Sequence, residues 1–218
     1  FERRLSGGFS TLVAYTFSES ITFQPSPAVG GNYAFERALT GFDVPHNFDV
    51  SFTYELPFGK GRRFANSNGF ADKVIGGWQL QALYQGQSGA PIGFGNVILT
   101  GGYDQLNLPT PSVQQWFNTA NFERRAAFQL DQNLRAFPLR LSNIRADGIN
   151  VWDMSVLKNF QVHEKLKVQL RGEAEGATNT PNFSGPNVGP ASTIFGQVNS
   201  TQTGQEERRI LVGLKLIF

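Results

Sequence analysis

The stretch HNFDVSFTYELPFGKG, residues 46–61, alternates between apolar and polar side chains from residue 46 to residue 58. The even positions carry rings or aliphatic side chains, namely His46, Phe48, Val50, Phe52, Tyr54, Leu56 and Phe58. The odd positions are polar, namely Asn47, Asp49, Ser51, Thr53 and Glu55. Successive side chains of a β-strand point to opposite faces, so this pattern predicts a strand with one apolar and one polar face. The apolar face must pack either on the core of a soluble protein or on lipid.

Five further segments repeat the period of two. They are FSTLVAYTF (9–17), WQLQALYQGQ (78–87), NVWDMSVLKNF (150–160), KLKVQLRGEAEG (165–176) and RRILVGLKLIF (208–218). Their lengths of 9 to 12 residues exceed the strand of about 5 or 6 residues that is usual in soluble proteins. They match the roughly 9–11 residues that a tilted strand needs to cross a bilayer. With 24 glycines and 20 phenylalanines in 218 residues, the pattern predicts an all-β fold.

The connections between these segments differ in length in an ordered way. They are long (18–45), medium (59–77), very long (88–149), short (161–164) and long again (177–207). In an antiparallel up-and-down meander of about six long strands, the three long loops lie at one end, and the two shorter turns and the C-terminus lie at the other. Outer-membrane barrels have this asymmetry, with long extracellular loops and short periplasmic turns. A soluble sandwich has no reason to sort its loops by side.

The connection 88–149 exceeds ordinary loop lengths, so we expect it to contain local structure of its own. Within it, PIGFGNVIL (91–99) and PLRLSNIR (138–145) alternate weakly and predict a small hairpin. The stretch VQQWFNTANFERRAAF (113–128) predicts a short helical turn.

Charge placement bears on the choice between lipid and a soluble core. The apolar positions of the six segments include no Asp or Glu and one lysine, Lys158, which we expect to snorkel at the periplasmic end. An Arg or Lys at mid-bilayer costs roughly 2–4 kcal/mol on the outer face of a barrel, so this exclusion is expected there. The polar positions of 165–176 carry charges of both signs, including Arg171, Glu173 and Glu175, as a salt-bridge ladder in a polar lumen would. The solvated outer face of a sandwich fits these charges too.

The remaining composition excludes several kinds of site. The chain has no cysteine, and His46 and His163 lack the spacing of metal ligands. A net charge of +2 gives no indication of nucleic-acid binding, and no apolar run reaches the roughly 18 residues of a membrane-spanning helix. The stretch PFGKGRR lacks phosphate-loop spacing and predicts a periplasmic turn with exposed Lys60, Arg62 and Arg63. We expect neither an enzyme nor a bound metal or cofactor.

The end of the chain indicates how a barrel would be recognised for assembly. Its last residues resemble the β-signal read by the bacterial barrel-assembly machinery, with Gly213, Leu216 and Phe218 at the matching positions. Leu211 stands where that motif prefers a polar residue. The chain opens on FERRLSGG without an initiator Met or a signal peptide, so we expect residues 1–218 to be a C-terminal piece of a longer protein.

The chain as a whole resembles the C-terminal barrel of TonB-dependent outer-membrane receptors of the Oar-like kind, which carry a carboxypeptidase-regulatory-like domain at the N-terminus. The stretches that carry the resemblance are 42–64, 76–94, WFNTANFE (116–123), 139–160, LRGEAEGATNTPNF (170–183), FGQV (195–198) and 208–218. The resemblance implies a segment of a barrel of about 22 strands with an internal plug, in the outer membrane of a Gram-negative-type bacterium. It implies energy-coupled uptake of an unidentified ligand, with TonB contacted through the N-terminal part that this chain lacks. About six strands are too few to close a barrel alone, and the alternative is a closed eight-stranded barrel that also uses the two weakly alternating segments of 88–149.

Loops on a rigid scaffold often carry the binding residues. In the long loops, Tyr103, Trp116, Phe117 and Asn118 are the candidates for ligand contact, although Trp116 and Phe117 are equally suited to pin the loop to itself. The alternative to a membrane receptor is a soluble or cell-surface β-sandwich used for binding or adhesion.

Overall fold

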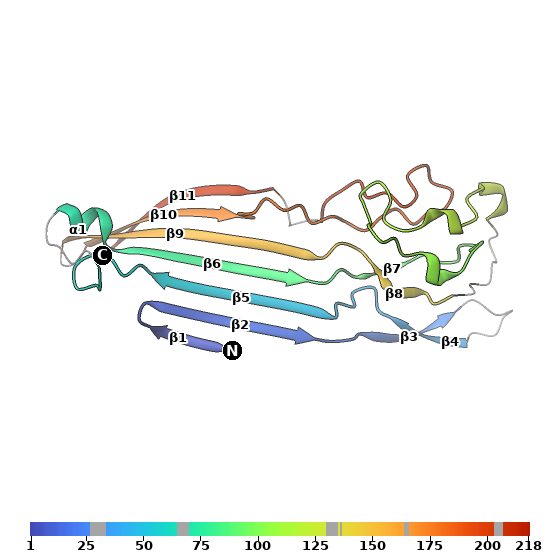
Figure 1. Ribbon diagram of the computed structural model, residues 1–218, viewed down its shortest axis with the longest axis horizontal. Coiled ribbons are helices and arrows are strands. Elements are labelled where there is room, and N and C mark those ends of the chain that lie inside the picture. Colours follow the sequence, from blue (N-terminus) through green and yellow to red (C-terminus); the bar gives the residue numbers. More distant parts are fainter. Residues whose placement is uncertain (27–33, 65–69, 130–134, 136, 164–165, 203–206) are drawn as a thin grey trace.

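The computed structural model describes the chain except for residues 27–33, 65–69, 130–134, 136, 164–165 and 203–206. Its main feature is a long antiparallel sheet of seven strands in the order β1-β2-β5-β6-β9-β10-β11 (Figure 1). The strands are β1 (Glu2–Ser6), β2 (Phe9–Phe17), β5 (His46–Glu55), β6 (Trp78–Gln87), β9 (Ile149–His163), β10 (Leu166–Glu175) and β11 (Arg209–Ile217). Sheet neighbours follow one another along the chain, apart from two excursions. The predicted meander of six long strands is therefore confirmed, with the short β1 added at one edge.

The two excursions form small sheets of their own. One is β3 (Ile21–Ser26) paired with β4 (Ala34–Leu39), and the other is β7 (Pro91–Gly93) paired with β8 (Arg140–Arg145). The β7–β8 pair confirms the hairpin expected from PIGFGNVIL and PLRLSNIR. The β3–β4 pair was not predicted, because prolines within ITFQPSP weaken the signal for a strand.

The helical elements are all short. They are α1 (Phe70–Ile75) and the 3₁₀ turns η1 (Tyr103–Gln105), η2 (Thr119–Asn121) and η3 (Ala126–Phe128). The turns η2 and η3 confirm the helical turn expected in 113–128, whereas α1 was not predicted. None of the described helices has the length and apolar character needed to cross a membrane.

The connections separate by length to the two ends of the sheet (Figure 1). The long connections lie at one end, which we call the loop end. At the opposite end, which we call the turn end, lie α1, the β9–β10 connection and the C-terminus. The predicted sorting of long and short connections is confirmed.

The strand register places the apolar positions that lie within the six long strands on one face. One row across the sheet joins Phe52 to Ala82, Met154, Ala174 and Ile210, each paired with the next. We call this side of the sheet the apolar face. The next row toward the turn end lies on the opposite side, which we call the polar face, and it pairs Thr53 with Gln81.

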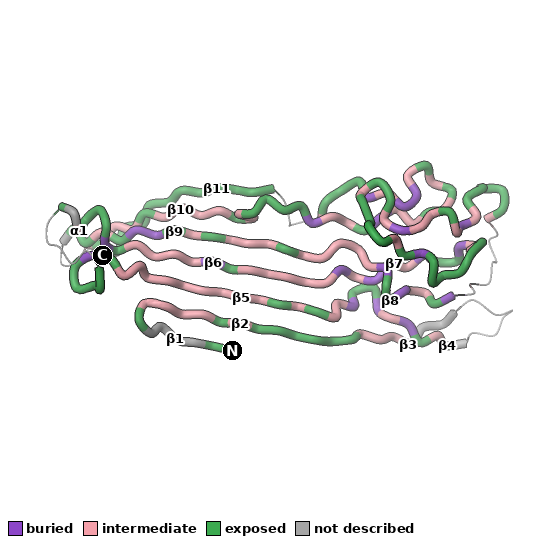
Figure 2. The backbone as a smooth tube through the Cα atoms, in the orientation of Figure 1, coloured by how far each residue is buried: buried purple, intermediate pink, exposed green. Residues whose placement is uncertain are grey.

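Most of the buried residues gather at the loop end (Figure 2), and a few, namely Ala82, Leu157 and Lys158, lie on β6 and β9. At the loop end the long connections pack into one unit, which we call the loop head and which comprises the described residues of 18–45, 88–148 and 176–202. Its core contains Ile92, Phe94, Val97, Leu106, Phe117, Phe122, Phe137, Leu141, Ile144 and Phe195. The loop head therefore has a hydrophobic core of its own, as the length of 88–149 led us to expect.

Four phenylalanines form the centre of this core. The ring centroid of Phe117, which has no exposed surface, lies 4.8 Å from that of Phe94, 5.6 Å from that of Phe122 and 5.2 Å from that of Phe195. Most of these pairs meet edge to face or tilted, as aromatic rings prefer. Because Phe195 comes from the connection after β10, the cluster joins two long connections.

The packing predicts that Phe117→Ala destabilises the loop head by roughly 3–5 kcal/mol, because the substitution leaves a cavity among the neighbouring rings. The measurement is the rate of limited proteolysis within 88–148 on the membrane-assembled protein, and this rate should rise. Tyr103→Ala is the control, since Tyr103 is about half exposed (49%) and its loss leaves no internal cavity. Equal protease resistance of the two variants would contradict the assignment of Phe117 to the core.

Candidate functional site

The side chains of the apolar face are intermediate or exposed along most of the strands, and those of the outer strands are the most exposed. Among its large side chains, Phe17 is 67% exposed, Ile210 70% and Val212 78%. In the described part of the chain, no second layer covers this face, because the two small sheets lie at the loop end. A water-exposed apolar surface of this extent marks a binding or membrane surface in a folded protein.

Aromatic side chains extend the apolar face toward the loop end. The ring centroids of Tyr84 and Trp152 lie 4.7 Å apart, and the Tyr15 hydroxyl lies 2.9 Å from Nδ1 of His46. Rings with an apolar body and a polar tip at this level fit the aromatic girdle of a membrane barrel. The same contacts also pack the rings on one another.

The polar face carries amides and ion pairs instead. Strand β6 contributes Gln79, Gln81, Gln85 and Gln87, and β10 contributes its charged residues. A guanidinium nitrogen of Arg171 lies 2.5 Å from Oε1 of Glu173, which confirms an ion pair of the predicted ladder. Leu12, Leu83 and Leu211 also lie on this face, so it is polar but not uniformly charged.

A cavity of about 300 Å³ opens on the polar face near the loop end. Its lining includes the charged side chains Asp153, Glu175, Glu207 and Arg209. The carboxylate of Asp153 accepts a hydrogen bond of 2.8 Å from the Gly176 amide, which fixes the turn after β10 above the sheet. Among the described residues, no three His, Asp or Glu side chains converge as a metal site requires.

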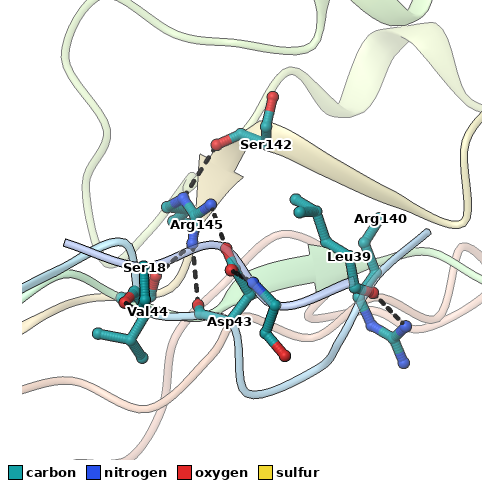
Figure 3. A network of polar contacts seen from close by, with 9 residues as sticks. Ser18, Leu39, Asp43, Val44, Arg140, Ser142 and Arg145 are labelled. Carbon is teal, nitrogen blue, oxygen red and sulfur yellow. Dashed lines mark hydrogen bonds and ion pairs between the residues drawn. The ribbon is translucent and has the colours of Figure 1, made fainter. Parts of the chain in front are cut away.

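An ion pair joins the first long connection to the central one (Figure 3). The Arg145 guanidinium donates to Oδ2 of Asp43 at 2.8 Å and to the Asp43 and Gly89 carbonyls at 3.0 Å. It also donates to the Ser142 carbonyl at 3.0 Å within β8. The Asp43 side chain is almost fully buried (1% exposed), and its Oδ1 accepts a 2.6 Å bond from the Ser20 amide.

The pKa of Asp43 results from opposing influences. Burial raises the pKa of this carboxyl, whereas the hydrogen bonds from the Ser20 amide and Arg145 and the charge of Arg145 lower it. The net pKa is below the ordinary value of 3.8. Asp43 is therefore charged at neutral pH and holds Arg145 as its counterion.

Two further arginines fasten the β3–β4 pair to the same region. Arg140 donates to the Leu39 carbonyl at 2.9 Å, and Arg135 forms an ion pair with Glu36 (Figure 3 shows the first contact). Glu36 also accepts a bond of 3.0 Å from the Leu139 amide. Residues of β8 and of the segment just before it thus hold the β3–β4 hairpin through both side-chain and backbone contacts.

The third long connection is attached in a similar way. Arg124 donates to the carbonyls of Pro190 and Ser192 at 3.3 and 2.9 Å, and its guanidinium lies 5.3 Å from the centroid of the Phe195 ring. Near β9, the Asp147 carboxylate accepts a 2.9 Å bond from the Phe183 amide. The three long connections therefore form one packed surface at the loop end.

The four residues predicted for ligand contact occupy different environments. Tyr103 is exposed, whereas Phe117 is fully buried in the core. Trp116 packs on the core and donates from Nε1 to the Arg145 carbonyl at 2.7 Å. The Asn118 side chain accepts a bond from the Ala120 amide and donates to the Gln105 carbonyl, both at 3.1 Å. Phe117 thus takes the packing role in this structure, and ligand contact by this group stays a prediction.

The sequence led us to expect that Lys158 snorkels to water. The structure shows that this expectation is wrong. The residue is 2% exposed, and its ammonium donates to the carbonyls of Val74, at 3.1 Å, and Gly76. It also lies 5.3 Å from the centroid of the Trp78 ring. The sequence did not reveal these partners, because they belong to α1 and the turn after it.

The predicted assembly signal lies on β11 and at its end. Gly213 pairs with Arg171 on the polar face, and Leu216 pairs with Val168 on the apolar face. Phe218 is 91% exposed at the turn end. Its accessibility suits recognition by another protein, which stays a prediction.

Sequence reasoning missed the residues that join the connections, above all Asp43, Arg135, Arg140 and Arg145. A signal was present, because the three arginines recur at intervals of five residues in RAFPLRLSNIR. Nothing local identified their acceptors, which lie about a hundred residues earlier in the chain.

A family model described as an outer membrane beta barrel domain matches residues 1–211. The chain therefore belongs to this family of outer-membrane β-barrel domains, and its location is the outer membrane of a Gram-negative bacterium. In such barrels, the apolar side chains of each strand face lipid and the alternate ones face the lumen. Searches of curated proteins and of solved structures returned no match.

The Asp43–Arg145 contact predicts an acid-sensitive attachment of the first long connection. The stabilisation is complete above the ordinary pKa of 3.8 and is lost as the pH falls through the lower pKa of the folded state. Asp43→Asn should weaken the attachment by about 2 kcal/mol at neutral pH, because it removes the counter-charge of Arg145. The measurement is cleavage of 18–45 by an acid-tolerant protease across the pH range. Asp104→Asn, at an exposed position, should keep the wild-type profile, and an unchanged profile in Asp43→Asn would refute the prediction.

The two faces predict opposite responses to a new charge at neighbouring positions of β5. Phe52→Arg places a guanidinium on the lipid-facing side at a cost of roughly 2–4 kcal/mol and should sharply reduce assembly into the outer membrane. Thr53→Arg points to the lumen and should be tolerated. The measurement is the amount of each variant in the outer-membrane fraction, and equal tolerance of both would count against the assignment of faces.

Proposed function

We propose that this chain is the C-terminal barrel segment of a TonB-dependent receptor of the Oar-like kind, which takes part in energy-coupled uptake of a ligand. The observation that carries the proposal is a sheet with lipid-facing and lumen-facing sides whose two edges, β1 and β11, have no further strand among the described residues. Open edges of this kind need further strands to close the barrel, and in this proposal the same protein supplies them. Wide barrels that need many strands are the ones that enclose an internal plug.

The distribution of the resembling stretches supports this proposal. The stretch 42–64 contributes Asp43, 139–160 contributes Arg145, and FGQV contributes Phe195 to the contacts of the loop head. Parts of these three resembling stretches thus meet in the loop head at the loop end. We assign this end to the outside of the cell and the turn end to the periplasm, as long loops and short turns are arranged in such barrels.

The remaining assignments follow from this placement. The loop head is the surface that first meets the ligand, with exposed Tyr103 among its contacts, and the polar face lines the path through the lumen. The barrel-assembly machinery reads Gly213, Leu216 and Phe218, and TonB binds a segment that precedes this chain in the whole protein. No catalytic step or cofactor is part of this proposal.

The proposal predicts that the full-length protein binds the periplasmic domain of TonB. Outer membranes solubilised in detergent should release the protein in a form that co-purifies with that domain, whereas a porin from the same membranes should not. Uptake through the receptor should also stop when the proton-motive force is dissipated. A full-length protein that stays in the outer membrane but shows no binding to TonB would leave the barrel in place and exclude the receptor class.

A further inference from the structure

The turn end of the sheet concentrates positive charge. We call the described residues 56–64 and 70–78 the turn-end crown. Its basic side chains are Lys60, Arg62, Arg63 and Lys73, and it contains one acidic side chain, Asp72. Because the net charge of the whole chain is only +2, the crown is more positive than the rest of the molecule taken together.

The helix α1 is bonded to the apolar side of the sheet. Trp78, on the apolar face, donates from its indole nitrogen to the Val74 carbonyl at 2.9 Å. Lys158, on the same face, donates to the carbonyls of Val74 and Gly76 at the C-terminal end of the helix. A cation is favourable at a helix C-terminus, where the carbonyls lack partners within the helix. These bonds place α1 at the rim of the surface that faces lipid.

The exposed side chains of the crown are those of an interfacial element. On α1, Phe70 is 82% exposed, Val74 51% and Ile75 42%. The rings of Phe58 and Phe64 are also exposed, with centroids 6.0 Å apart. Apolar and aromatic groups next to basic groups are typical of segments that lie in the headgroup region of a membrane.

Three of the basic side chains are available at the surface of the crown. Lys60, Arg63 and Lys73 are exposed, whereas Arg62 forms an ion pair of 2.7 Å with Glu55 of the polar face. Asp72, the acidic residue of the crown, accepts a hydrogen bond from the Lys60 amide. This bond joins α1 to the segment 56–64. The charge that the crown presents outward is therefore positive.

We propose that the turn-end crown binds anionic phospholipid in the periplasmic leaflet of the outer membrane. The apolar side chains of α1 insert among the lipid chains beside the barrel, and Lys60, Arg63 and Lys73 bind the phosphate groups. The crown continues the lipid-facing surface of the sheet without a break through Trp78 and Lys158, which is why lipid is its partner. This inference rests on the assignment of the turn end to the periplasm.

The test places a fluorescent probe on α1. The chain has no cysteine, so Phe70→Cys provides one site in it for a bimane label. The labelled full-length protein is reconstituted in phosphatidylcholine vesicles containing a minor fraction of nitroxide-labelled lipid, with either a phosphatidylglycerol or a phosphatidylcholine headgroup. Both lipids should quench the label. Phosphatidylglycerol should do so at a content at least roughly fivefold lower, because a single basic side chain near an anionic surface contributes about that factor and the crown presents three.

Two comparisons separate the possible results. In the Lys60→Gln, Arg63→Gln and Lys73→Gln triple variant, the label at position 70 should be quenched equally by both lipids. A label on Met154→Cys, in the middle of the apolar face, should be quenched by both lipids without preference. Failure at position 154 would overturn the membrane assignment itself. Quenching at position 154 without quenching at position 70, or equal quenching by both lipids at position 70, would overturn the inference about the crown.

Discussion

The alternation of side chains, held in register across six strands, is the constraint on which the molecule depends. A shift of one residue between two strands would move every apolar side chain of one of them into the lumen and every polar one into lipid. The backbone hydrogen bonds of the sheet also satisfy the amide and carbonyl groups that a bilayer leaves without partners. Pairing and patterning therefore support each other, and strands as different as β5 and β11 keep the same orientation of their faces.

The chain divides its stabilising interactions between two environments. Along the sheet, apolar side chains lie on the outside, so their burial depends on lipid and not on other parts of the protein. In the loop head, Phe117 and its neighbours are buried by the protein alone. Polar contacts such as Asp43 with Arg145 then fix how the long connections lie on one another.

The strands were predictable from the sequence because each carries its own signal within about ten residues. The pairing of PIGFGNVIL with PLRLSNIR was predictable for the same reason. The attachments of Arg135, Arg140 and Arg145 were not, because an arginine does not reveal from sequence which of many distant oxygens it will bind. The helix α1 was not predicted from the sequence, because six residues inside a connection give too few turns for a periodic pattern. For Phe117, composition allowed either packing or ligand contact, and only the three-dimensional neighbours place it in the core.

The residues that form the loop-head core come from distant parts of the chain. They therefore limit the order in which parts of the protein can fold. Phe195 follows β10 in the chain, so the aromatic cluster lacks a member until residues up to 195 have been delivered. Contacts between residues near 40 and residues near 140 likewise carry the entropic cost of closing a long loop. The pairs β1–β2 and β9–β10 have no such delay, since short connections join their strands. The loop head thus depends on contacts that cannot form until distant parts of the chain are present.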